Sequence, residues 1–95
     1  MEKLKAASND RRKLEIQREL DNVDAKIYAL RSEMDAELGA LRERKGRANN
    51  NLAGATLEQS ISTEMQMVEA KYDARIKVVM DTAAILRAEL AAIGN

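Results

Sequence analysis

The sequence predicts an all-α protein built as an antiparallel helical hairpin, with two long helices that pack in the manner of a coiled coil. Three observations lead to this prediction. An apolar stripe at helical spacing runs from Leu57 to Ile93, a second stripe runs from Ile16 to Leu41, and a segment rich in asparagine and glycine separates them. Each stripe covers one side of a helix and therefore needs a partner helix.

Composition agrees with long helices and excludes several other classes. The 95 residues include 34% charged and 2% aromatic side chains and no proline, and basic and acidic residues balance to a net charge of zero. Such a composition is typical of long helices or coiled coils. The zero net charge favours neither nucleic acid nor membrane. No apolar run is long enough for a membrane span or a signal peptide, so we expect neither.

The first helix is expected over about residues 3–45. Its stripe follows steps of four and three residues, which is the heptad pattern of coiled coils. Charged residues flank the stripe at the usual interhelical positions, and the opposite side of the helix is mostly alanine. That alanine-rich side can accept a second close contact.

A loop is expected over residues 46–55. Gly46 is placed to end the first helix in the left-handed conformation, and Asn49, Asn50 and Asn51 have poor helix propensity. Thr56 can cap the second helix, with Gln59 completing a capping box. One uninterrupted helix of some 90 residues in a parallel coiled coil is the rival architecture, because a glycine inside a helix costs only about 1 kcal/mol.

The second helix is expected over residues 56–93, so that residues 1–95 form a single hairpin domain. If Leu41 faces Leu57, then Ile16 lies opposite about residue 82, and both stripes are used almost completely. Two helices alone leave each stripe partly exposed to water. A side patch on the second helix suggests contact with a further helix. The patch consists of Met67, Ala74, Val78, Ile85 and Ala92. A homodimer forming a four-helix bundle is the simplest solution.

The stripe residues are therefore the candidate interface, within the chain and with partners. They are Ile16, Leu20, Val23, Ile27, Leu30, Met34, Leu38, Leu41, Leu57, Ile61, Met65, Val68, Tyr72, Ile76, Val79, Leu86, Leu90 and Ile93. Tyr72 is expected in the core with its hydroxyl at the edge, whereas Tyr28 lies off the stripe. Lys71 is expected on the polar flank of the second helix.

A basic cluster at the end of the first helix is the candidate contact for an anion or a partner. It consists of Arg42, Arg44, Lys45 and Arg47. The competing interpretation is that these cations complement the negative end of the helix dipole. A second basic group, Arg11 to Lys13 with Arg18, lies near the start of the same helix.

The sequence offers no sign of catalytic chemistry. Histidine and cysteine are absent, which removes the commonest bases, nucleophiles and zinc ligands. We therefore expect no enzyme, no metal and no cofactor. The expected function is a cytoplasmic helical protein–protein interaction module: an adaptor, assembly chaperone or inhibitor that binds a second copy of itself and a larger protein. The alternatives are a nucleic-acid-binding regulator that uses the basic clusters and a structural coiled-coil scaffold.

Overall fold

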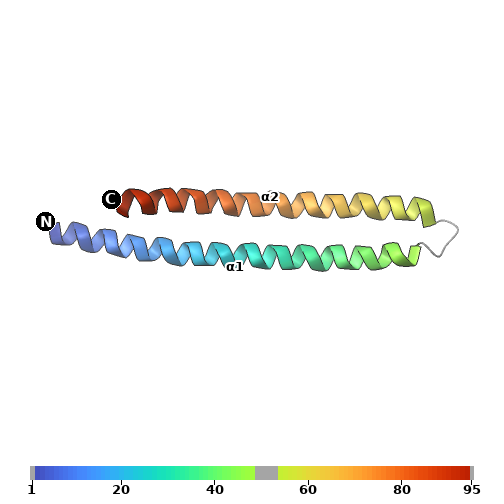
Figure 1. Cartoon of the computed structure of the whole chain (residues 1–95), viewed down its shortest axis with the longest axis horizontal. Helices are drawn as coiled ribbons and strands as arrows, with labels where there is room; N and C mark the ends of the chain where they lie inside the picture. The colour runs from blue at the N-terminus through green and yellow to red at the C-terminus, as the bar shows by residue number, and fades with distance from the viewer. Residues whose placement is uncertain (1, 49–53, 95) are drawn as a thin grey trace. The chain divides into compact units, whose positions relative to one another are not determined.

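A computed structural model shows the chain as two helices that pack against each other as a hairpin. It describes the backbone of residues 2–48 and 54–94 and the side chains of residues 7–47 and 57–94. Helix α1 spans Glu2–Ala48 and helix α2 spans Gly54–Gly94, and the described residues contain no strand. The two helices run side by side in opposite directions (Figure 1). The all-α hairpin is confirmed, and the single continuous rod is excluded.

The chain divides into two compact units, each made of one segment from each helix. Unit 1 combines α1 up to Ile27 with α2 from Lys77, and unit 2 comprises the residues from Tyr28 to Ile76. In Figure 1, unit 1 contains the blue end of α1 and the red end of α2. Both units are therefore held by contacts between residues far apart in the sequence.

The core of unit 1 is a set of aliphatic side chains from the two stripes. Ile16, Val23, Ala83 and Leu86 are buried, and Ile16 has no exposed surface at all. Half-buried side chains pack around them: Leu20, Ile27, Val79, Leu90 and Ile93. Burying one aliphatic side chain of this size contributes about 1.5–3 kcal/mol. Such tertiary burial, more than helix propensity, is the usual source of helical stability in proteins.

The core of unit 2 is formed by the other end of each stripe. Leu41 and Ile61 are buried together, with Met65 and Val68 packed against them. Leu38, Tyr72 and Ile76 are also buried. These positions follow the helical spacing predicted from the sequence, so the stripes do form the interior of the hairpin.

The register of the helix pair differs from the predicted one. Leu41 clusters with Ile61, one turn beyond Leu57, and Leu57 is 43% exposed. Leu57 is therefore not a core residue, contrary to the prediction. The physical reason is that apolar residues recur at every turn of the stripe, so a shift of one turn still places an apolar side chain opposite Leu41.

The helix ends also differ from the predicted ones. Gly46 lies inside α1, which continues to Ala48, and no described glycine has a positive φ. The predicted left-handed cap at Gly46 is therefore wrong. Thr56 lies inside α2, which begins at Gly54, so the predicted capping box starts two residues too late. Of the predicted loop, residues 49–53 lie outside the described residues.

Candidate functional site

Most stripe residues are used between the two helices of one chain. Besides the buried residues of both units, Leu30 and Met34 are half-buried, as are the residues that pack around each core. Leu57 is the only candidate interface residue on the stripes that is exposed. The contact of these side chains with another molecule stays a prediction.

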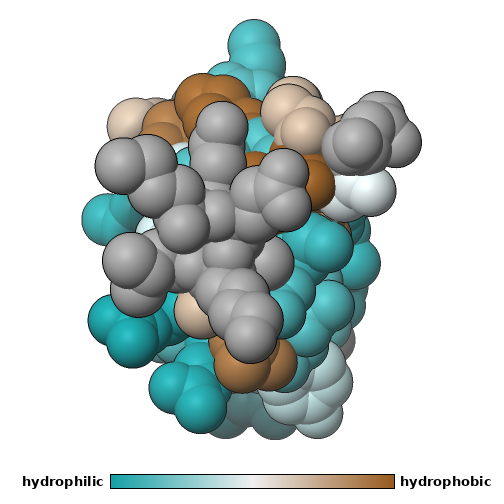
Figure 2. Space-filling model, turned by 90° about the vertical axis from the view of Figure 1, so that its left-hand side faces the viewer, coloured by the Kyte–Doolittle hydropathy of each residue, from teal (hydrophilic) through white to brown (hydrophobic). Residues whose placement is uncertain are grey.

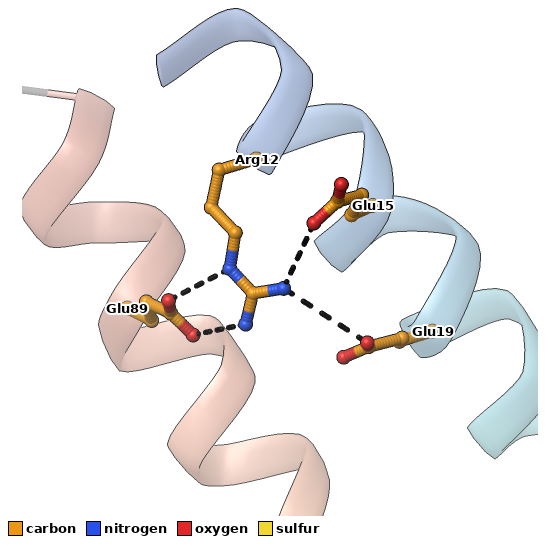
Figure 3. Close-up of polar contacts among 4 residues, drawn as sticks. All are labelled: Arg12, Glu15, Glu19 and Glu89. Atoms are coloured by element: carbon orange, nitrogen blue, oxygen red, sulfur yellow. Dashed lines mark hydrogen bonds and ion pairs between the residues drawn. The ribbon is translucent and has the colours of Figure 1, made fainter. Parts of the chain in front are cut away.

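An arginine of α1 ties the two helices of unit 1 together (Figure 3). Arg12 Nε donates to Glu89 Oε1 at 2.8 Å, and Arg12 Nη2 donates to Glu89 Oε2 at 2.8 Å. Its Nη1 lies 3.2 Å from Glu15 Oε2 and 3.9 Å from Glu19 Oε1. The fork of two parallel bonds to Glu89 has a defined geometry, so it fixes how far one helix is shifted along the other.

This cluster also changes the titration of its members. The hydrogen bonds from Arg12 lower the pKa of the Glu89 carboxyl. In return, the hydrogen bonds to Glu89 and then Glu15 raise the pKa of Arg12, which remains a cation at any physiological pH. Three carboxylates thus surround one of the basic residues that the sequence offered for nucleic-acid contact.

A tyrosine, a glutamate and a lysine form the corresponding polar link in unit 2. The Tyr72 hydroxyl donates to Glu37 Oε1 at 2.9 Å, and Lys71 Nζ donates to Glu37 Oε2 at 3.2 Å. The Lys71 ammonium group also lies 4.8 Å from the centre of the Tyr72 ring, within the range of a cation–π contact. The prediction for Tyr72 is confirmed: the residue is 3% exposed, and its hydroxyl reaches a partner at the edge.

The link in unit 2 shifts two pKa values in opposite directions. The hydrogen bond from Tyr72, followed by that from Lys71, lowers the pKa of Glu37. The same hydrogen bond to Glu37, together with desolvation, raises the pKa of the Tyr72 phenol. Both shifts favour a carboxylate that accepts from a protonated phenol, which is the state that holds the helices together.

A groove of about 540 Å³ lies on one side of unit 2. Its apolar lining residues are Ala40, Leu41, Met67 and Val68. Two ion pairs, Glu37 with Lys71 and Arg44 with Glu64, also line it. An apolar groove with charged residues around it is the shape that accepts an amphipathic helix.

The largest exposed apolar side chains of α2 point away from the core. Met67 is 67% exposed, Val78 is 65% exposed and Ile85 is 69% exposed. Figure 2 looks onto the end of the chain that carries both termini; brown atoms show at the top, on the α2 side, and also at the bottom. A helix that is apolar on both of its sides is normally covered on both, so the outward residues of α2 are the candidate functional site.

The predicted basic cluster is exposed except for Lys45, and two of its arginines lie next to a carboxylate. Arg44 Nη1 lies 3.5 Å from Glu64 Oε2, and Arg47 Nη2 lies 3.8 Å from Glu43 Oε2. Arg42 is exposed and Lys45 is half-buried, and neither forms an ion pair with a described residue. Lys45 and Arg47 lie in the last turn of α1, where cations complement the helix dipole.

The described residues hold no group of three or more carboxylates that could bind a metal ion. None of their buried side-chain nitrogen or oxygen atoms lacks a hydrogen-bond partner. Neither described helix contains a stretch long and apolar enough to cross a membrane.

Comparison with known proteins adds no relative. No family model, no curated protein and no solved structure matches the chain. The fold and the surface define the class of protein: a two-helix hairpin whose second helix is apolar on its outer side as well as its inner side.

Sequence reasoning missed three ion pairs that link described residues of the two helices. Arg12, Glu37 and Arg44 lie at the edge of the α1 stripe, and their partners lie at matching edges of α2. A comparison of charges across the two stripes in several registers would have found them. The apolar spacing of either stripe does not indicate these pairs, because it leaves the register between the helices open.

Proposed function

We propose that this protein is a non-enzymatic, cytoplasmic interaction module that binds other proteins through its helix faces, as an adaptor, assembly chaperone or inhibitor. The observation that supports the proposal most strongly is the exposure of Met67, Val78 and Ile85 on the outward side of α2. Burial of apolar surface is the main driving force for association between proteins. A second copy and a larger protein are the proposed partners.

The arrangement of charge supports protein over nucleic acid as the partner. Arg12 is held by three carboxylates, and Arg44 and Arg47 are each next to one. Phosphate contacts need basic groups that are free to replace the cations condensed on the nucleic acid, and these three arginines already have carboxylate partners. The absence of cysteine from the sequence is consistent with a cytoplasmic location.

Site-specific photo-crosslinking in the native cell tests the proposal. A photoreactive amino acid replaces Ile85 in one variant and Arg18, an exposed residue of α1, in the matched control. We expect the variant at position 85 to trap protein and the variant at position 18 to trap none. Equal trapping at both positions, or crosslinks to nucleic acid alone, would refute the proposal.

A further inference from the structure

The outward side of α2 carries a second stripe, whose members alternate at spacings of four and three residues. We call it the outward stripe, and all of its members are exposed. They are Met67, Lys71, Ala74, Val78, Asp81, Ile85, Ala88 and Ala92. Six of the eight are apolar, which is the pattern of a helix–helix seam. Its alanines leave room for the close approach of another helix.

The two charged members of the outward stripe restrict which partner surface can pack against it. Lys71 forms an ion pair with Glu37 of its own chain and is still exposed. Asp81 is exposed and forms no ion pair with any residue that the structure describes. A purely apolar partner would bury Asp81 without a counterion, which is costly, and would leave Lys71 with Glu37 as its only acid. The best-matched partner therefore offers a base opposite Asp81 and a second acid opposite Lys71.

A second copy of the same helix meets this requirement when it runs in the opposite direction. We propose that the protein forms a dimer in which the outward stripes of two α2 helices pair antiparallel about a two-fold axis beside residue 76, with Lys71 of each copy opposite Asp81 of the other. The proposal rests on the proposed function and names its partner. The same register places Met67 opposite the partner's Ile85 and Ala74 opposite the partner's Val78.

Other arrangements of the two stripes leave the charges unsatisfied. A parallel pair places Asp81 against Asp81 and Lys71 against Lys71, and like charges in contact cost several kcal/mol. A shift of the antiparallel pair by one layer brings Asp81 against Ala74 or, in the other direction, against Met67. Arg75 and Lys77 flank the stripe near the axis, where their long side chains can extend into solvent.

Charge reversal with mixing tests the register. Asp81→Lys alone sets two lysines against each other twice per dimer, and Lys71→Glu alone sets an acid against Asp81 twice. We expect each variant alone to raise the dimer dissociation constant at least about tenfold in sedimentation equilibrium. An equimolar mixture should restore the wild-type value, because the mixed dimer contains one Lys–Asp and one Lys–Glu contact.

Lys71→Glu also removes the ion pair with Glu37, so it could weaken the dimer by unfolding the hairpin. The helix content of each variant, measured by circular dichroism, distinguishes the two causes. A mixture that dimerises no better than its components, with both components folded, would overturn the proposed register.

Single cysteines give a readout that does not depend on charge, since the natural sequence contains none. At 1.5 Å per residue, the two copies of residue 78 would lie about 6 Å apart along the axis and the two copies of residue 88 about 36 Å apart. We therefore expect a short bis-maleimide to link Val78→Cys into dimers and to leave Ala88→Cys, which is also at an exposed position, unlinked. Efficient linking of Ala88→Cys indicates a parallel pair and overturns the proposal.

The wild-type protein separates this inference from the proposed function. A dimer that does not grow with concentration supports the inference, and larger assemblies or a monomer overturn it. If the protein is monomeric while the photoreactive residue at position 85 still traps a different protein, the dimer is excluded and the interaction function stands.

Discussion

At the scale of single residues, the contact between Tyr72 and Glu37 shows how one hydroxyl can define a helix pair. Tyr72 is buried, and its hydroxyl is the donor 2.9 Å from Glu37. The same carboxylate accepts from Lys71. The sequence predicted a core tyrosine with its hydroxyl at the edge. For Lys71 it predicted only a position on the polar flank of the second helix, without a partner. Only the fold brings position 37 next to positions 71 and 72.

Tyr72→Phe should raise the pKa of Glu37 towards its ordinary value of 4.5, because the hydrogen bond from the phenol is the main cause of the lowering. Carboxyl carbon shifts followed through an acid titration by NMR measure this change. Tyr28→Phe is the matched control, because Tyr28 is exposed. A Glu37 pKa that is the same in the wild type and in Tyr72→Phe contradicts the assigned cause.

At the scale of the helices, the position of a glycine relative to the helix end has a testable consequence. Gly46 lies inside α1, and a Cβ added there meets nothing within 4 Å. Gly46→Ala should therefore stabilise the protein by about 0.5–1 kcal/mol, the usual cost of glycine in a helix relative to alanine. Gly39→Ala, which also meets nothing within 4 Å, should have a similar effect.

Thermal or urea unfolding measures the change in the free energy of unfolding for both glycine variants. The left-handed cap predicted from the sequence gives the opposite sign at Gly46, because alanine is strained at positive φ. A loss of stability in Gly46→Ala with a gain in Gly39→Ala would restore that cap.

The two stripes also show how far sequence reasoning reaches at this scale. Periodicity identified the buried faces, including Ile16, Ile61 and Ile76, because burial of one side of a helix repeats every 3.6 residues. It placed Leu57 in the core, because a periodic stripe looks the same after a shift of one turn. The pairs of Arg12 with Glu89 and Arg44 with Glu64 distinguish between such registers, and they join residues on different helices.

The same aspartate substitution at two nearby positions of α2 separates the inner face from the outer one. Ile76 is 7% exposed, whereas Val78, two residues later, is 65% exposed. Ile76→Asp should remove most of the helix signal at neutral pH, because an unpaired buried carboxylate costs several kcal/mol of a total stability of about 5–15 kcal/mol. Val78→Asp should keep the helices and lose the dimer.

Circular dichroism measures the loss of helix, and sedimentation equilibrium measures the loss of the proposed dimer. Equal melting temperatures for Ile76→Asp and Val78→Asp would show that the inner stripe is not the core of unit 2.

At the scale of the whole molecule, the balance of charge is compatible with the proposed pairing of two outward stripes. A net charge of zero gives two copies no overall repulsion, so the local contacts between them decide how they meet. The candidate site was partly visible in the sequence, where Met67, Val78 and Ile85 form a side patch. The proposed role of Asp81 was not visible in the sequence, because a charged residue on a helix is normally solvated, and only the fold shows that Asp81 forms no ion pair with a described residue.

Stability should depend on pH through the two carboxylates that link the helices. The pKa values of Glu37 and Glu89 are lowered in the folded chain. A lowered pKa contributes stability that is present above the unfolded value, near 4.5, and is lost as the pH falls through the folded value. We therefore expect the melting temperature to fall progressively as the pH is lowered below about 4.5.

The double variant Glu37→Gln with Glu89→Gln should show a smaller fall over the same range, because neither position can then change its charge. Asp24→Asn with Asp35→Asn is the matched control, since neither aspartate forms an ion pair with a described residue, and its profile should follow the wild type. Melting curves recorded by circular dichroism at constant ionic strength provide the comparison. If the glutamine variant loses as much stability in acid as the wild type does, the acid sensitivity arises from the accumulating positive charge of the whole chain, and the two interhelical carboxylates are not its cause.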